Sequence, residues 1–176
     1  MFGFGKKKNE IVIEAVCSKL RDLFGILEHR LGVLPAELTE DPYVLGYVMG
    51  AATIFTQIET SGKASAELRG LVTLASLKAV FGPLGMTAPQ ATMALHLIHG
   101  SEEARRGYNA ADLVIGVAQG LVDRDRDPEI VAAKMAVANM PSSIREVMGA
   151  NDRGLLTTEL LEQVFFMPIE TRYSMK

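Results

Sequence analysis

The stretch NEIVIEAVCSKLRDLFGILEHRL, residues 9–31, places an apolar side chain at every third or fourth position. This spacing predicts an amphipathic helix, because about 3.6 residues complete a turn and the apolar side chains then share one face. The members of this stripe are Ile13, Val16, Leu20, Leu23, Phe24, Leu27 and Leu31. Because the stripe is narrow, we expect the helix to lie on the outside of a core or in the seam of a dimer.

Signals for the start and end of helices recur along the rest of the chain. Ser, Thr, Asp and Asn are typical N-caps, proline suits the first helical position, and glycine favours the end of a helix. The expected starts are Asp41, Ser65, Thr87, Asn109, Asp127, Ser143 and Thr157 or Thr158. Strand-like runs are few. The sequence therefore predicts an all-α fold, a compact bundle of about seven or eight helices in which irregular orthogonal packing is allowed.

The predicted helices differ in how much of their surface is apolar. Those over residues 41–60, 65–81, 87–100 and 127–140 are apolar over more than half of their circumference. Such helices bury several faces, so we expect each to contact neighbours on more than one side. The glycine pairs Gly46/Gly50 and Gly116/Gly120 are spaced by one helical turn, which predicts close helix approaches.

Length and helix placement together suggest one folded unit. A chain of 176 residues falls within the range of a single domain. We expect a flexible basic N-terminal tail over residues 1–9, a helical domain over residues 10–166, and a loose C-terminal tail over residues 167–176.

Composition argues against several classes of function. The net charge of −3 does not suit a nucleic-acid binder, which would carry a basic face. No apolar run reaches the ~20 residues that a transmembrane helix needs. The single cysteine, Cys17, cannot form an internal disulfide, and no signal peptide is evident, so we expect a cytoplasmic protein.

Two histidines one turn apart raise the alternative of a metal- or ligand-binding bundle. His96 and His99 lie on the polar face of the helix over residues 87–100, and Glu102 or Glu103 follows shortly after. Zinc needs three or four protein ligands, which this group would supply only if the helix continued. Gly100 and Ser101 instead indicate a helix end and a new N-cap, so we predict no cofactor.

The first residues suggest a second alternative, contact with a membrane surface. Phe2 and Phe4 would enter the lipid interface while Lys6, Lys7 and Lys8 meet anionic headgroups. Three lysines fall short of the usual cluster of about four to eight. A solvated terminus is the simpler interpretation.

Sequence signals of an enzyme are absent. The run DRDRDPE, residues 123–129, imitates the start of a calcium loop but has Pro128 where the loop requires glycine. Cys17 has no histidine placed beside it by the sequence, and it is expected to behave as a small apolar residue. Arg105 and Arg106 are expected to balance Glu102 and Glu103.

We therefore expect a non-enzymatic helical module for protein interaction or regulation that forms homo-oligomers. The partner-binding candidates are the central members of the first helix's stripe, Val16, Leu20, Leu23 and Leu27. This expectation requires the stripe to face another copy of the chain and not the chain's own core.

Overall fold

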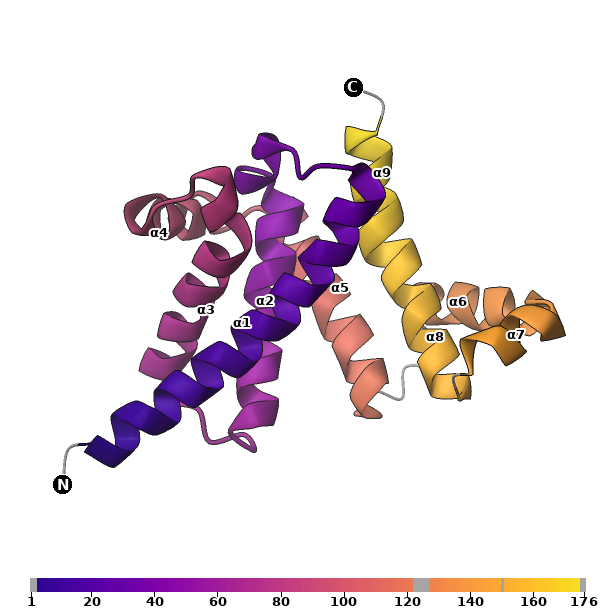
Figure 1. Ribbon diagram of the computed structural model, residues 1–176, viewed down its shortest axis with the longest axis horizontal. Helices are drawn as coiled ribbons and strands as arrows, with labels where there is room; N and C mark the ends of the chain where they lie inside the picture. The colour runs from indigo at the N-terminus through magenta and orange to yellow at the C-terminus, as the bar shows by residue number, and fades with distance from the viewer. Residues whose placement is uncertain (1–2, 122–126, 150, 175–176) are drawn as a thin grey trace. The chain divides into compact units, whose positions relative to one another are not determined.

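The computed structural model describes residues 3–121, 127–149 and 151–174 (Figure 1). Its regular elements are helices, and no strand occurs among these residues, which confirms the predicted all-α fold. The chain divides into two compact units, Met1–Ala111 (unit 1) and Asp112–Lys176 (unit 2). The expectation of one domain over residues 10–166 stays a prediction.

Unit 1 is built on three helices that pack against one another. They are α1 (Gly3–Leu31), α2 (Pro42–Glu59) and α3 (Ala66–Phe81), and each contacts the other two (Figure 1). A short 3₁₀ turn, η1 (Ala36–Thr39), lies between α1 and α2. This arrangement gives unit 1 a core of its own.

The apolar stripe of α1 is the inner face of this core. Its side chains at Val16, Leu20 and Leu27 have no exposed surface, and Phe24 is only 2% exposed. The ring of Phe24 meets Phe81 of α3 edge to face, with ring centroids 5.6 Å apart. The predicted helix and its stripe are therefore confirmed, and the stripe is covered by α2 and α3.

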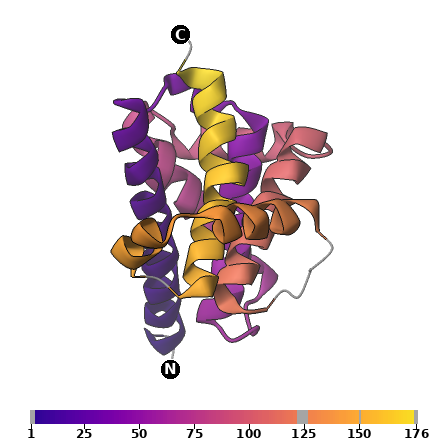
Figure 2. The same ribbon diagram turned by 90° about the vertical axis from the view of Figure 1, so that its right-hand side faces the viewer.

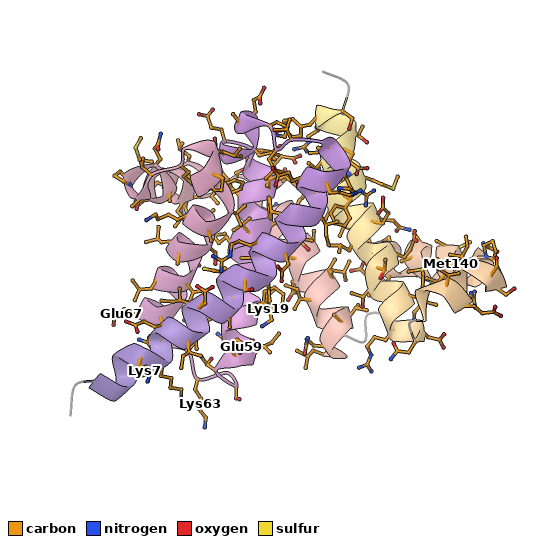
Figure 3. All side chains as sticks on the ribbon, in the orientation of Figure 1. Lys7, Lys19, Glu59, Lys63, Glu67 and Met140 are labelled. Carbon is orange, nitrogen blue, oxygen red and sulfur yellow. The ribbon has the colours of Figure 1, made fainter. Side chains whose placement is uncertain are left out.

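Polar contacts hold the outer edge of the same helix. Lys19 of α1 forms an ion pair with Glu59 of α2, and the two side chains point toward each other (Figure 3). The Lys19 ammonium also lies 5.5 Å from the centre of the Phe55 ring. A cation over an aromatic face adds a modest attraction. The ion pair thus lies at the solvent-exposed edge of the contact between α1 and α2.

Several predicted helix starts are confirmed in unit 1. The carboxylate of Asp41 accepts hydrogen bonds from the backbone N–H groups of Tyr43 and Val44, at 2.9 and 3.1 Å. Ser65 accepts from the N–H of Leu68 in the first turn of α3. These bonds satisfy backbone donors that have no partner inside a helix, and each is worth ~1 kcal/mol.

The chain turns sharply between α3 and the next helix of unit 1. Helix α3 is followed by the 3₁₀ turn η2 (Gly82–Leu84) and then by α4 (Ala88–Leu97). Gly82 is helical, with a φ of −56°, and the left-handed residue is Gly85, with φ +92°. The chain thus continues helically for one more turn before a glycine allows it to reverse.

Helix α5 (Glu102–Gln119) begins in unit 1 and approaches α2 very closely. A Cβ atom built on Gly46 of α2 would lie 2.0 Å from the backbone oxygen of Ala104, and one on Gly107 would lie 2.0 Å from that of Tyr43. The predicted close approach at Gly46 is therefore confirmed. The predicted helix start at Asn109 is wrong, because α5 runs through this residue.

Unit 2 contains α6 (Pro128–Asn139), α7 (Ser142–Met148), α8 (Asp152–Leu161) and α9 (Met167–Tyr173). A π-helical turn, η3 (Glu162–Phe166), joins α8 to α9 into one long run, which α6 and α7 cross (Figure 2). Helix α6 packs against α8. The largest fully buried side chains of this unit are Leu160, Phe165 and Ile169.

Both expected tails are largely helical. Helix α1 begins at Gly3, because no proline separates this position from residue 9 and extending an existing helix across Gly5 costs only ~1 kcal/mol. At the other end, the chain remains helical from Met167 to Tyr173 despite Pro168. The π-helical turn directly before this proline widens the helix where the ring would otherwise meet a carbonyl.

Two starts in unit 2 differ from the sequence prediction. Helix α8 begins earlier than Thr157, with Asn151 accepting a hydrogen bond from the N–H of Gly154 at 2.8 Å. The start expected at Ser143 lies inside α7, which begins at Ser142 after an N-cap, Pro141, that makes no side-chain bond. Asp127 is confirmed as the cap of α6, since its carboxylate accepts from the N–H of Glu129.

Two apolar helices are less buried than their composition predicts. In α4 only Ala91 and Ala94 are buried, and in α6 only Ile130 and Ala133. The expectation of neighbours on several sides is therefore wrong for α4 and α6 within this chain. Each leaves large apolar side chains exposed to solvent.

No single helix in the described ranges combines the length and the apolarity of a membrane crossing. Only two consecutive segments, Ala66–Leu84 and Ala88–Leu97, reach that composition together, and they are bent by 113° at their junction.

Candidate functional site

The histidine candidates lie at the corner between α4 and α5. His96 is on the last turn of α4, Gly100 adopts a left-handed φ of +82°, and α5 starts at Glu102. The hydroxyl oxygen of Ser101 accepts a hydrogen bond from the N–H of Ala104 at 3.3 Å, which makes Ser101 the predicted N-cap. The helix therefore does not continue from His99 to Glu103, as a metal site would require.

The two glutamates form ion pairs with arginines of their own helix. Glu103 pairs with Arg106 at 2.9 Å, and Glu102 lies 3.8 Å from Arg105. This confirms the interpretation of the arginines as balancing charge. Exposed pairs of this kind contribute at most ~1 kcal/mol each to stability.

The corner does not assemble a metal site. Across the described residues, His, Cys, Asp and Glu side chains form no group of three or more that could hold a metal ion. His99 instead lines a cavity of about 270 Å³ together with Arg105 and Tyr108. The guanidinium brings positive charge to this cavity, which opposes the binding of a cation. The set of His96, His99 and Glu102 or Glu103 is therefore not brought together.

The partner-binding candidates of α1 are enclosed by the chain itself. Val16, Leu20 and Leu27 have no exposed surface, and Leu23 is half-buried. The expected dimer seam is corrected to an internal contact with α2 and α3. A periodic stripe looks the same in both cases, because each requires an apolar face.

The membrane-contact candidates are only partly described. Phe2 lies outside the described residues, as do the side chains of Phe4 and Lys6. Lys7 and Lys8 are exposed on the first turns of α1. Membrane contact stays a prediction. Of the imitation calcium loop, residues 123–126 also lie outside the described residues.

Cys17 is a buried side chain of α1. It is 4% exposed, and its Sγ lies 4.0 Å from the Oγ of Ser76 on α3. Burial raises the pKa of the Cys17 thiol, and the contact with Ser76 offsets this only in part. The neutral thiol is therefore the dominant form at neutral pH, as expected of a small apolar residue.

We expect a thiol-selective disulfide reagent to modify Cys17 on the order of a hundredfold more slowly in the folded chain than in denaturant. Because the pKa is raised, the native rate should not level off near the ordinary thiol pKa of about 8.5. The measurement is labelling followed by mass spectrometry across pH. Equal rates in folded and unfolded protein would show that the side chain is accessible.

Unit 2 holds an exposed apolar surface that the sequence does not predict as a site. Helices α6 and α7 each present a row of apolar side chains to solvent, here called the α6–α7 apolar stripes. The stripes comprise Val131 and Met135 on α6, at 40% and 62% exposure, and Ile144, Val147 and Met148 on α7, at 47%, 88% and 38%. Their spacings of three and four residues place the members of each stripe on one side of their helix.

The two helices are held together by a polar contact. The guanidinium of Arg145 on α7 donates a hydrogen bond through Nη2 to the backbone oxygen of Val137 near the end of α6. Met140 lies at the junction between them (Figure 3). Gly149 ends α7 with a left-handed φ of +57°. Helices α6 and α7 together form a hairpin, residues 128–148. It packs on the rest of unit 2 through Ile130 and Ala133 of α6, and α7 has no buried residue.

The sequence contains a signal for this site, because the helix predicted over residues 127–140 is apolar over more than half of its circumference. That pattern predicts contacts inside the chain on several sides. The structure provides those contacts at Ile130 and Ala133 only. The chain matches no protein-family model, no curated protein and no solved structure.

Proposed function

We propose that this chain is a protein-interaction module that self-associates through the α6–α7 apolar stripes. The observation that carries the proposal is the exposure of large apolar side chains at helical spacing on two consecutive helices. Large apolar side chains exposed together on neighbouring helices are typical of sites where another protein binds.

Charge favours a second copy as the partner. The hairpin carries Glu129 and Glu146 against Lys134 and Arg145, so its formal charge balances. In a twofold contact each residue meets the same surface on its partner, and a hairpin of one sign would repel itself. A balanced hairpin has no such barrier.

The character of the stripes also suits association. Methionine is flexible and polarisable, so Met135 and Met148 can adapt to an opposing surface. Val147, at 88% exposure, is the most exposed large apolar side chain in the described part of the chain. We assign it the centre of the contact.

The proposal predicts that the chain sediments as a dimer or larger species and that Val147→Asp or Met135→Asp yields a folded monomer. Each aspartate places a charge in the contact, and the dissociation constant should rise at least tenfold, about 1.4 kcal/mol. Sedimentation velocity over a range of concentrations measures the assembly, and far-UV circular dichroism verifies the fold.

Met93→Asp is the matched control. Met93 has the same 62% exposure as Met135 but lies on α4 in unit 1. Its replacement should leave the assembly unchanged. A chain that is monomeric at every concentration, or that assembles equally well after both unit 2 substitutions, would refute self-association through these stripes.

A further inference from the structure

A second hollow lies in unit 1, between the start of α2, the turn η2 and helix α4. The volume of this open cavity is about 540 Å³. Its inner wall is apolar and includes the buried side chains Leu45, Met86, Ala94 and Ile98. Cavities of about 300–1,000 Å³ with mainly apolar walls are the usual size and character of small-molecule sites.

The rim of this cavity is apolar and open to solvent. Met93 and Leu97 of α4 line it and are 62% and 78% exposed. These are the side chains that the composition of α4 predicts to be buried. A ligand that occupies the cavity would remove them from water, and each buried methylene group contributes ~0.8 kcal/mol.

The polar groups of the lining set the chemistry of the ligand. Of the described residues that line the cavity, Glu40 alone is charged, and its exposed carboxylate forms no hydrogen bond or ion pair with another described residue. The hydroxyl of Thr39 donates to the backbone oxygen of Ala36 at 2.8 Å, so it can offer a ligand only electron pairs. Both groups accept hydrogen bonds and so match a donor-rich cation.

The remaining polar side chain is fixed by the fold. The Oε1 atom of Gln90 accepts from the backbone N–H and the hydroxyl of Thr87, at 2.8 and 2.7 Å. This capping box orients the amide at the start of α4. The lining thus combines an apolar wall, one carboxylate and a preoriented amide.

We propose that this cavity binds a small apolar molecule that carries a protonated amine. The hydrocarbon part lies against Leu45, Ala94 and Ile98, and the ammonium group donates to the carboxylate of Glu40 and the hydroxyl oxygen of Thr39. This site lies wholly in unit 1, so it is independent of the proposed association through unit 2.

The test compares three probes that share one hydrocarbon chain, namely octylammonium, 1-octanol and octanoate, titrated into the full chain by calorimetry or NMR. We expect octylammonium to bind most tightly, 1-octanol less tightly, and octanoate at least about tenfold more weakly than octylammonium. Glu40→Gln should weaken octylammonium about fivefold and leave 1-octanol unchanged, because only the exposed ion pair is lost.

A second pair of variants locates the binding. Met93→Ser shortens the apolar rim without adding charge and should weaken all three probes, whereas Met135→Ser, at the same exposure, should have no effect. Ala94→Phe fills the cavity and should abolish binding in a chain that still folds by circular dichroism. Equal affinity for the three probes, no saturable binding, or binding insensitive to Met93→Ser would overturn the proposal.

Discussion

Gly46→Ala and Gly107→Ala are each expected to lower the free energy of unfolding by about 3 kcal/mol, the upper end of the usual cost of overpacking, because a clash with backbone cannot be relieved by a rotamer change. The new methyl group would lie 2.0 Å from a backbone oxygen in either case, that of Ala104 or of Tyr43. Helices α2 and α5 would have to separate, and the contact along both would be lost.

The expected loss of stability differs among the glycines, because a new Cβ atom would meet its neighbours at different distances. A Cβ on Gly50 would lie 2.9 Å from the backbone oxygen of Tyr108, so Gly50→Ala should cost less than Gly46→Ala. Gly25 in α1 and Gly70 in α3 have nothing within 4 Å of a new Cβ. At these two positions alanine should raise stability by roughly 0.5–1 kcal/mol, through helix propensity alone.

Urea unfolding followed by far-UV circular dichroism gives the order of the five variants. The expected order of stability places Gly25→Ala and Gly70→Ala above the natural chain and Gly50→Ala below it. Gly46→Ala and Gly107→Ala should be the least stable. A Gly46→Ala protein as stable as the natural chain would mean that α2 and α5 do not approach as the structure places them.

The same glycines show which parts of the fold the sequence could predict. The N-caps Asp41, Ser65 and Asp127 accept hydrogen bonds from backbone N–H groups no more than three residues away. The local sequence is therefore enough to predict their roles. Gly107, in contrast, allows a close approach to the backbone of Tyr43, which is far away in the sequence. No neighbouring residue distinguishes this glycine from one that ends a helix. The expected start at Asn109 rests instead on a residue type that is typical of N-caps, although α5 runs through this position.

The candidate site illustrates a second limit. An apolar stripe predicts that one face of a helix is buried, but it does not predict which element or partner buries it. For α1 the cover is α2 and α3, whereas Val131 and Met135 of α6 remain uncovered within the chain. Both helices follow the same 3.6-residue rule, so only the tertiary arrangement separates an internal seam from an exposed stripe.

The cavity of unit 1 also involves apolar side chains that the chain itself leaves exposed. Its rim residues, Met93 and Leu97, belong to a helix whose composition predicts burial. Two of the predictions that failed, the enclosure of α4 and of α6, therefore mark the two surfaces to which we assign partners. Apolar side chains left in water are unfavourable for an isolated chain, and contact with a partner removes that cost.

Leu20→Glu is expected to unfold unit 1 and not to release a folded monomer. Leu20 has no exposed surface and lies where α1 meets α2 and α3. The substitution loses the burial of a leucine side chain and places a carboxyl group in an apolar core, at a cost of at least about 4 kcal/mol. This is a large part of the roughly 5–15 kcal/mol that stabilises a typical domain.

Ile11→Glu on the same helix is the control, because Ile11 is 62% exposed and its replacement should leave both the fold and the assembly intact. Circular dichroism reports helix content and light scattering reports mass, so the two readouts separate unfolding from dissociation. A Leu20→Glu chain that keeps its helix content and halves its mass would place the α1 stripe against a second copy. In that case the core of unit 1 would have to be built differently, since the same side chain cannot face α3 and a partner at once.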